Sequence, residues 1–188
     1  MKKVIFTLAV MFACVSASMA QEDVFQKGDM VLGVGVGIGN RLIGTGYSTT
    51  IPPIIIMGEY GITDALIQKT GKGFVGVGGY FAYTTNKYKY SGSDYGWKYS
   101  NMIIAGRGAF HYQFVDKLDT YAGVIAGFNI SSSSWYGSTG HDYKADSNGG
   151  FIYSTFVGAR YYFTDNIAVF AEAGYGFNLL EAGLAIKF

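Results

Sequence analysis

The sequence predicts an all-β fold, an eight-stranded antiparallel up-and-down transmembrane β-barrel. First, the chain is rich in aromatic residues (17%) and contains only 14% charged residues. Second, beyond its N-terminal segment it has no apolar run of about 18 residues, the length that indicates a membrane-spanning helix. Third, eight segments show the alternation of apolar with small or polar residues that is typical of β-strands. A closed barrel accounts for all three observations, because closure pairs the backbone polar groups inside the lipid.

The N-terminal segment has the three parts of an export signal. Lys2 and Lys3 precede an apolar stretch, Val4–Val15, and the small residues of Ser18–Ala20 fit a cleavage site. The apolar stretch is too short to cross a bilayer as a helix, which takes about 20 residues. We therefore expect residues 1–20 to be a signal peptide. The remaining residues, 21–188, are expected to form one barrel domain that is exported through the periplasm.

Composition also restricts the chemistry of the mature chain. The single cysteine, Cys14, could be a lipid-modification site, but the bulky Phe12 before it favours an ordinary signal-peptide residue. The mature chain then has neither a thiol nor a disulfide. Removing two of the 14 basic residues leaves 12 against 13 acidic residues, a net charge of −1. This balance argues against nucleic acid as a partner, because no basic excess is available to neutralise phosphates.

The strands are assigned in chain order from period-two alternation and from the turn residues between them. Each segment is close to the length of about 9–11 residues that a tilted transmembrane strand needs. The predicted strands are Gly28–Gly39, Ile54–Ile62, Gly73–Thr84, Tyr99–Gln113, Asp119–Ile130, Gly150–Phe163, Ile167–Tyr175 and Leu179–Phe188. An even number of strands allows both ends of the barrel to lie on the same side of the membrane.

The connections differ in length, as in outer-membrane barrels with long external loops and short periplasmic turns. Long polar connections are predicted at Asn40–Pro53, Thr85–Lys98 and Ser131–Gly149. Short turns are predicted at Val115–Lys117 and Thr164–Asn166, where Asp and Asn favour tight turns. Two connections fit this pattern less well, since Thr63–Lys72 is long for a periplasmic turn and Gly176–Asn178 is short for an external loop.

Alternation also indicates which face of each strand is outside. In the first strand Leu32 and Val34 alternate with Gly33 and Gly35. A water-soluble barrel would carry many charges on its outer face, whereas here the less apolar face is mostly glycine with a few charges. Such a face suits the interior of an eight-stranded barrel, which is only just wide enough for side chains. We therefore expect the apolar face to contact lipid, although the fifth strand, Asp119–Ile130, allows either assignment.

The C-terminal segment Glu181–Phe188 alternates in the same way and ends in an aromatic residue. It resembles the signal, here Phe188, by which the barrel-assembly machinery recognises outer-membrane proteins. The segments Pro52–Asp64 and Gly76–Tyr80 resemble the small OmpX-like or OmpA-like outer-membrane β-barrel proteins of the Gram-negative cell envelope, and the resemblance covers the mature chain. It implies an outer-membrane location in contact with membrane lipids and with the assembly machinery. We expect a monomer without a cofactor and without a periplasmic domain after Phe188.

Inward-facing ionisable residues are the first candidate site. The predicted lumen charge network consists of Glu59, Arg107, Arg160, Glu172, Glu181 and Lys187. We expect its arginines to pair with its glutamates, because an unpaired charge in a narrow lumen costs several kcal/mol. His111 is expected to be a hydrogen-bonded lumen residue. These residues predict a plugged lumen, and the alternative is a narrow porin-like channel for small solutes.

A lipid-modifying enzyme is the third function considered. His141, Asp142 and Ser131–Ser134 lie in one predicted loop, and nucleophilic catalysis can use such residue types. However, neighbouring residues of a loop do not hold the required geometry, because catalytic groups need a rigid scaffold. Two histidines without a cysteine also disfavour a metal site. The chain is therefore predicted not to be an enzyme, with no catalytic, cofactor-binding or metal-binding residue.

Aromatic residues in the long connections are the second candidate site. These external binding candidates are Tyr88, Tyr90, Tyr95, Trp97, Trp135 and Tyr136. Loops rich in Tyr, Ser and Gly resemble binding paratopes, in which rigid aromatic rings supply contact area. An aromatic girdle with strand extensions would give the same pattern. The sequence thus predicts a non-enzymatic structural or surface-interaction role, with extracellular surface ligands as candidate partners, and it leaves the ligand open.

Overall fold

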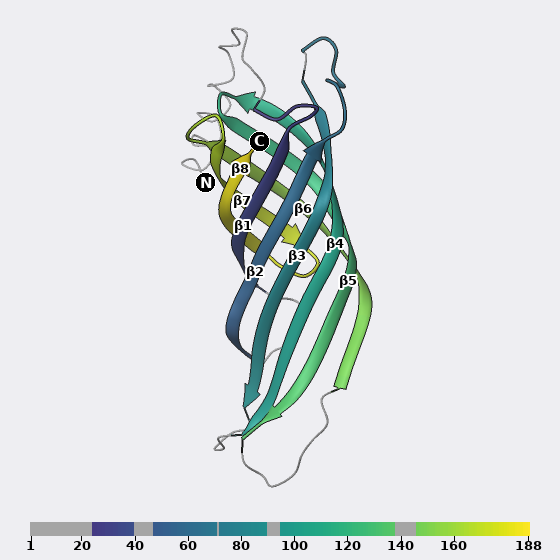
Figure 1. The fold of residues 1–188 in the computed structure, drawn as a ribbon, viewed down its shortest axis with the longest axis vertical. Helices are drawn as coiled ribbons and strands as arrows, with labels where there is room; N and C mark the ends of the chain where they lie inside the picture. Colours follow the sequence, from purple (N-terminus) through teal and green to yellow (C-terminus); the bar gives the residue numbers. More distant parts are fainter. Residues whose placement is uncertain (1–23, 40–46, 71, 90–94, 138–145) are drawn as a thin grey trace, which may run out of the picture.

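The computed structural model describes residues 24–39, 47–70, 72–89, 95–137 and 146–188, so the predicted signal peptide lies outside the described residues. Each strand pairs antiparallel with its neighbours in the chain, and β8 pairs with β1 to close the barrel (Figure 1). The strands are β1 Met30–Ile38, β2 Ser48–Gly61, β3 Phe74–Lys89, β4 Gly96–Val115, β5 Leu118–Tyr136, β6 Asp146–Tyr162, β7 Ile167–Tyr175 and β8 Leu180–Lys187. The predicted all-β, eight-stranded fold is confirmed. The described part of the chain has no helix long and apolar enough to cross a membrane.

The middle strands are longer than predicted and project beyond the barrel, away from the C-terminus (Figure 1). The sequence predicts loops at Thr85–Lys98 and Ser131–Gly149, and this prediction is wrong, because most of their described residues belong to β3, β4, β5 and β6. Pairing of β3 with β4 continues to Lys89↔Gly96, and pairing of β4 with β5 continues to Gly96↔Tyr136. These segments are polar, yet their Tyr, Trp and Thr residues favour extended backbone.

We call this projecting sheet the ribbon. It comprises residues 47–53, 85–89, 95–100, 131–136 and 146–149. One of its edges is β2, whose pairing with β1 ends at Val36↔Ile54. Pro52 and Pro53 lie on this edge, where a residue without an N–H is tolerated. The register between β2 and β3 shifts between Ile51 and Ile54 at the same place.

The short turns and the C-terminus lie at the opposite end of the barrel, which we call the periplasmic end. The backbone N–H groups of Met30 and Phe188 each donate to the other residue's carbonyl, at 3.2 and 2.8 Å. Before β1 the chain folds into this end, where Phe25 is 2% exposed and the Val24 N–H donates to Gln113 Oε1 at 2.7 Å. This end of the lumen is therefore covered by Val24 and Phe25, which lie just before β1.

Side chains alternate between the two faces as expected. Outward residues such as Leu32, Val34 and Leu184 are about half exposed, whereas their neighbours along the strands are covered. The ambiguous fifth strand is resolved, because Val124 and Phe128 are exposed. The outward belt is thus apolar, which agrees with its predicted contact with lipid.

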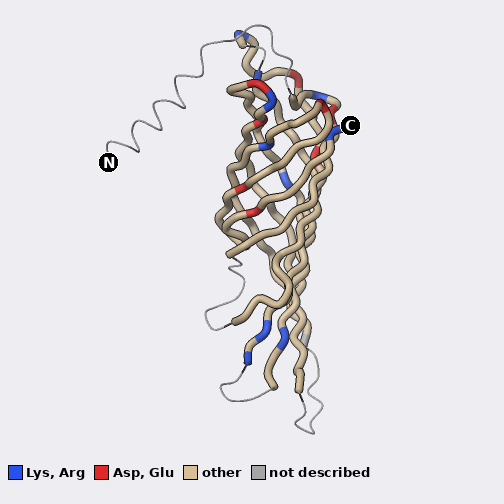
Figure 2. The backbone as a smooth tube through the Cα atoms, turned by 90° about the vertical axis from the view of Figure 1, so that its left-hand side faces the viewer, with Lys and Arg blue, Asp and Glu red and all other residues tan. Residues whose placement is uncertain are grey.

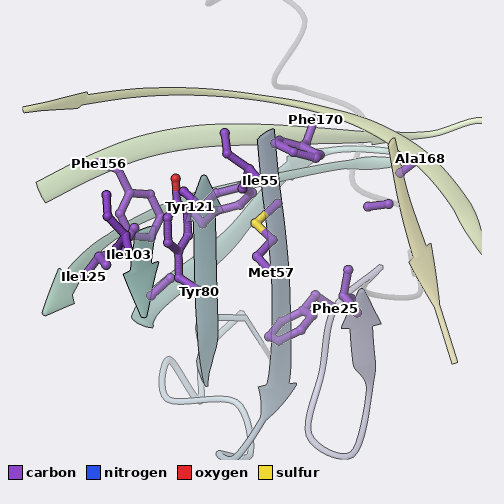
Figure 3. Packing of buried hydrophobic residues seen from close by; sticks show 14 of the residues in the cluster. Phe25, Ile55, Met57, Tyr80, Ile103, Tyr121, Ile125, Phe156, Ala168 and Phe170 are labelled. Atoms are coloured by element: carbon purple, nitrogen blue, oxygen red, sulfur yellow. The ribbon is translucent and has the colours of Figure 1, made fainter. Parts of the chain in front are cut away.

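Large apolar side chains fill the lumen (Figure 3). Phe170 of β7 lies against the glycines of β1 and β8. A Cβ atom added to Gly35 would lie 2.8 Å from the Phe170 ring, and one added to Gly183 would lie 2.7 Å from it. The glycine-rich inner face therefore provides the space that bulky residues from other strands occupy, as close packing requires.

Candidate functional site

Arg160 of β6 is the centre of the charge network in the lumen. Its side chain is fully buried (0% exposed). Nη1 donates to Asp119 Oδ2 at 3.2 Å, and Nη2 donates to Glu59 Oε2 at 3.2 Å. Asp119 lies directly opposite Arg160 in the pairing of β5 with β6, whereas Glu59 reaches it from β2 on another wall of the barrel. Arg160 therefore connects opposite sides of the lumen.

His111 of β4 bridges the same two carboxylates. Its Nδ1 lies 3.0 Å from Asp119 Oδ1, and its Nε2 lies 3.0 Å from Glu59 Oε1. An imidazole with a carboxylate at each nitrogen fits the protonated form, which donates from both nitrogens. Phe25 stacks on the ring with a centroid distance of 4.0 Å and covers it from the periplasmic end. His111 is thus a hydrogen-bonded lumen residue, as the sequence predicts.

Arg107 of β4 forms the second half of the network. Its Nη2 and Nη1 donate to the two carboxylate oxygens of Glu172 at 2.9 and 3.2 Å, a bidentate pair. The Tyr121 hydroxyl donates to the same Glu172 Oε1 at 2.9 Å. The guanidinium carbon lies 4.3 Å from the ring centroid of Phe156, so the cation is also covered by an aromatic face. A longer contact of 3.7 Å from Arg107 Nη2 to Glu59 Oε2 joins this half to the Arg160 half.

The structure places Glu181 and Lys187 apart from this network. Glu181 Oε1 accepts hydrogen bonds from the Tyr80 hydroxyl at 2.7 Å and from Asn178 Nδ2 at 2.8 Å. It lies near the external start of β8, whereas the arginines lie deeper in the barrel. Lys187 lies at the periplasmic rim, where its Nζ is 3.8 Å from Asp29 Oδ2. The expected pairing of arginine with glutamate therefore occurs for Glu59 and Glu172 and not for Glu181.

These contacts brace the barrel across its interior. The ionic groups come from β2, β4, β5, β6 and β7, and with a protonated His111 three cations meet three carboxylates. Gly158 leaves space for the charge network, because a Cβ there would lie 2.5 Å from the Tyr121 ring and 2.8 Å from Glu172 Cγ. The arrangement fills the cross-section with fixed, mutually neutralising charges.

Three members of the lumen site were missed by the sequence reasoning: Asp119, Tyr121 and Tyr80. The sequence contained a signal for Asp119 and Tyr121. Val124 and Phe128 are large apolar residues at the alternate positions of β5, so they are expected to face the lipid, which leaves Asp119 and Tyr121 on the inner face. Tyr80 has the parity of Gly76 and Gly78, the inward glycines of β3. Choosing a partner for each acid needs the tertiary structure, since Glu59 lies 101 residues from Arg160.

The inner face of the ribbon carries the described aromatic candidates, apart from Tyr136. Tyr88, Trp97 and Trp135 are register partners across β3, β4 and β5 and form one row on the face that continues the lumen wall. Trp97 and Trp135 pack edge to face at 5.4 Å, and Tyr95 packs on Trp135 at 5.5 Å. The row is thus held by ring contacts between strands.

Two further rings, Tyr47 and Tyr99, lie beside this row. Tyr47, just before β2, packs on Tyr88 at 5.3 Å and on Tyr99 at 5.4 Å. We call the six residues Tyr47, Tyr88, Tyr95, Trp97, Tyr99 and Trp135 the aromatic platform. Of the predicted candidates, Tyr136 lies on the other face of the ribbon, and Tyr90 lies outside the described residues.

The outer face of the ribbon differs in chemistry. Lys87 and Lys98 lie directly opposite each other in β3 and β4. Lys87 Nζ is 5.1 Å from the ring centroid of Tyr136, which extends over Gly96. Figure 2 shows the basic segments of the ribbon at the end away from the C-terminus. The two faces thus present aromatic rings on one side and ammonium groups on the other.

No protein-family model matches the chain, and no curated protein matches its sequence. Among solved structures, the attachment invasion locus protein Ail of Yersinia pestis, in complex with the heparin analogue sucrose octasulfate, overlaps with a TM-score of 0.56 and 12% identity. That match covers 87% of this chain and 100% of Ail. A second Ail crystal structure gives a TM-score of 0.51, 11% identity and the same coverage. The chain has the fold of the small outer-membrane β-barrels.

The β-barrel domain of Pseudomonas aeruginosa OprF overlaps less well, with a TM-score of 0.46, 14% identity and coverage of 87% of this chain and 98% of that one. The architecture shared with the two Ail structures is the eight-stranded barrel that the sequence predicts. At these identities the similarity concerns the fold, so the role of the chain has to be argued from its own residues. His141 and Asp142, which were considered as catalytic residues, lie outside the described residues.

Proposed function

We propose that the chain is a non-enzymatic outer-membrane barrel with a plugged lumen that binds an external glycan on the aromatic platform of its ribbon. The observation that carries this proposal is the row Tyr88, Trp97 and Trp135, which crosses three strands on one face beyond the barrel. Half-exposed rings fixed by their neighbours offer contact area at low entropic cost. Their flat faces match the apolar C–H faces of sugar rings.

Polar residues beside the platform suit the hydroxyl groups of such a ligand. Asn86 and Ser133 flank Tyr99 in the neighbouring row, and Asn101, Asn129 and Ser131 hydrogen bond to one another below it. The complex of Ail with a heparin analogue supports an external glycan as the class of ligand to test first. The proposal assigns the lumen to stability and the ribbon to recognition.

The plugged lumen supports this proposal over the alternative of a narrow channel. Arg107 and Arg160 are each buried to within a few per cent, and both span the interior between walls of the barrel. An ion passing this level would have to separate pairs that neutralise one another. No arrangement of the described residues favours a reaction centre.

Tryptophan fluorescence gives a direct test, because the chain contains only two tryptophans, Trp97 and Trp135, and both belong to the platform. The mature barrel refolded in detergent is titrated with heparin oligosaccharides and with a neutral oligosaccharide of equal length. We expect a saturable change in emission with at least one of them. Tyr88→Ala should weaken binding about tenfold, which corresponds to about 1.4 kcal/mol, while both tryptophans remain.

Tyr136→Ala is the matched control, since it removes the same ring from the other face of the ribbon. It should bind as the wild type does. Equal affinities for the two variants, or no saturable change with either sugar, would reject the platform as a glycan site.

A further inference from the structure

The outward belt contains a shallow apolar groove near the periplasmic end of the barrel. Its volume is about 530 Å³, and it crosses β4, β5 and β6. The rings of Phe110, Tyr112 and Phe114 in β4 lie beside the smaller side chains of Thr120 and Ala122 in β5. The Thr120 hydroxyl donates to the Tyr112 carbonyl, so this polar group is satisfied within the protein. The remaining surface suits a hydrocarbon chain, which gains van der Waals contacts in such a groove.

The connection Thr63–Lys72, which is long for a periplasmic turn, reaches the β4 side of this groove. Ile67 and Lys72 are direct partners across it, and the Ile67 N–H donates to the Lys72 carbonyl at 2.9 Å. A Cβ added to Gly73 would lie 3.3 Å from Ile67 Cγ1 and 3.1 Å from Phe110 Cζ. Ile67 is 40% exposed. The connection therefore continues the apolar surface beyond the Phe110 ring.

Lys72 places an ammonium group at the same position. Its Nζ donates to the Gln113 carbonyl at 2.8 Å and lies 5.9 Å from the ring centroid of Tyr112, which also lines the groove. Among the described residues no carboxylate forms an ion pair with Lys72, although Lys27 and Lys187 each have one. An ammonium has three N–H donors, so donors remain for an anion.

The groove and the ammonium follow one another in the order of the parts of a phospholipid. Aromatic rings such as Tyr112 and Phe114 near the end of a barrel strand are typical of the membrane interface. A lysine at this level lays its aliphatic stem along apolar surface and holds its charge among the headgroups. A phosphate there would accept charge-assisted hydrogen bonds from Lys72 while the attached chain lies along the groove.

We propose that this groove and Lys72 bind one phospholipid of the periplasmic leaflet, with an acyl chain in the groove and the phosphate at the ammonium. The occupant is a phospholipid, because the groove belongs to the lipid-facing belt and its one adjoining cation complements a phosphate. The site lies at the end of the barrel opposite the ribbon, so it does not depend on the glycan proposal.

Native mass spectrometry of the refolded mature barrel tests the site. Phosphatidylglycerol, or diacylglycerol with the same chains, is added, and bound lipid per barrel is counted across lipid concentrations. We expect the phospholipid to bind more tightly. Lys72→Met keeps the aliphatic stem and should weaken this binding about fivefold, which corresponds to about 1 kcal/mol for one lysine near anionic lipid. Lys72→Arg should retain the binding.

A matched pair of variants tests the groove. Ala122→Phe places a ring in the groove and should weaken phospholipid binding severalfold. Ala126→Phe adds the same ring at an exposed, outward position of β5 that does not line the groove, and it should bind as the wild type does. Lys27→Met is the control for charge, since Lys27 is paired with Asp64 at the same end of the barrel.

Equal phospholipid binding by the wild type, Lys72→Met and Ala122→Phe, all folded by circular dichroism, would overturn the assignment. Inorganic phosphate is the competitor that distinguishes a soluble anion from a lipid. If it displaces phosphatidylglycerol, and diacylglycerol binds equally well, Lys72 belongs to an anion site and the phospholipid assignment is wrong.

Discussion

Replacing Arg160 by methionine tests the buried brace most directly. The substitution keeps an apolar chain of similar length but removes the donors to Asp119 and Glu59, both at 3.2 Å. Deleting one partner of a buried ion pair typically costs about 3–5 kcal/mol, because the other charge remains uncompensated. We expect the lower end, about 3 kcal/mol or a 100-fold shift in the folding equilibrium, because His111 and Arg107 still face the two acids.

Urea unfolding of the refolded barrel in lipid vesicles provides the measurement. Tryptophan emission reports from the ribbon, away from Arg160, and circular dichroism reports from all strands. Coincident transitions would justify a two-state free energy. Lys27→Met is the control, because it removes a cation whose ion pair with Asp64 is exposed and is expected to contribute about 0–1 kcal/mol.

A second variant separates charge balance from packing. Arg160→Met/Asp119→Asn removes one carboxylate together with the arginine, and we expect it to recover at least half of the lost stability. If Arg160→Met alone costs less than about 1 kcal/mol, as for a surface pair, water must be compensating the network. Such a result would show that the lumen around Arg160 is not closed to water.

Two further predictions address the same interior. Gly158→Val should lower the stability by about 1–3 kcal/mol, because overpacking would displace Tyr121 or Glu172, whereas Gly79→Val, with no atom within 4 Å of the added Cβ, should have little effect in the same urea titration. An unchanged midpoint for Gly158→Val would show that Tyr121 and Glu172 move aside without cost. In planar-bilayer recordings the wild-type barrel should show no steady conductance, since the charge network crosses the lumen; a steady ion current would instead support the channel alternative.

The barrel could be predicted from the sequence because lipid imposes a strong local rule. In a membrane barrel nearly every outward-facing residue of a strand is apolar, which makes every second residue apolar. Strands such as Ile167–Tyr175 can therefore be located with correct bounds from alternation alone. The rule fails where the lipid ends. In Thr85–Lys89 and Ser131–Tyr136 both faces are polar or aromatic, and the same pattern describes a strand in water or a loop. Only long-range pairing distinguishes these two possibilities.

The sequence predicts which charged residues line the lumen, but it does not predict which of them form ion pairs with one another. Inward parity identifies Glu59, Arg107, Arg160 and Glu172 without knowledge of the fold. Which acid meets which base depends on the stagger of strands around the barrel, which no local pattern encodes. Glu181 has the correct parity but lies too near the external mouth, where Tyr80 and Asn178 hydrogen bond to it instead.

The residues of β4 suit several different environments along one alternating strand. From the periplasmic end its inward residues run from His111 and Arg107 to Trp97, while its outward residues run from Phe110 to Lys98. A slip of one residue would exchange the two faces. Arg107 would then enter the lipid, where a midplane arginine costs about 2–4 kcal/mol, and Trp97 would take the place of Lys98 on the outer face of the ribbon. The charge network in the lumen and the ribbon therefore require the same register of β4. The charges that fill the lumen thus also determine which residues each face of the ribbon presents.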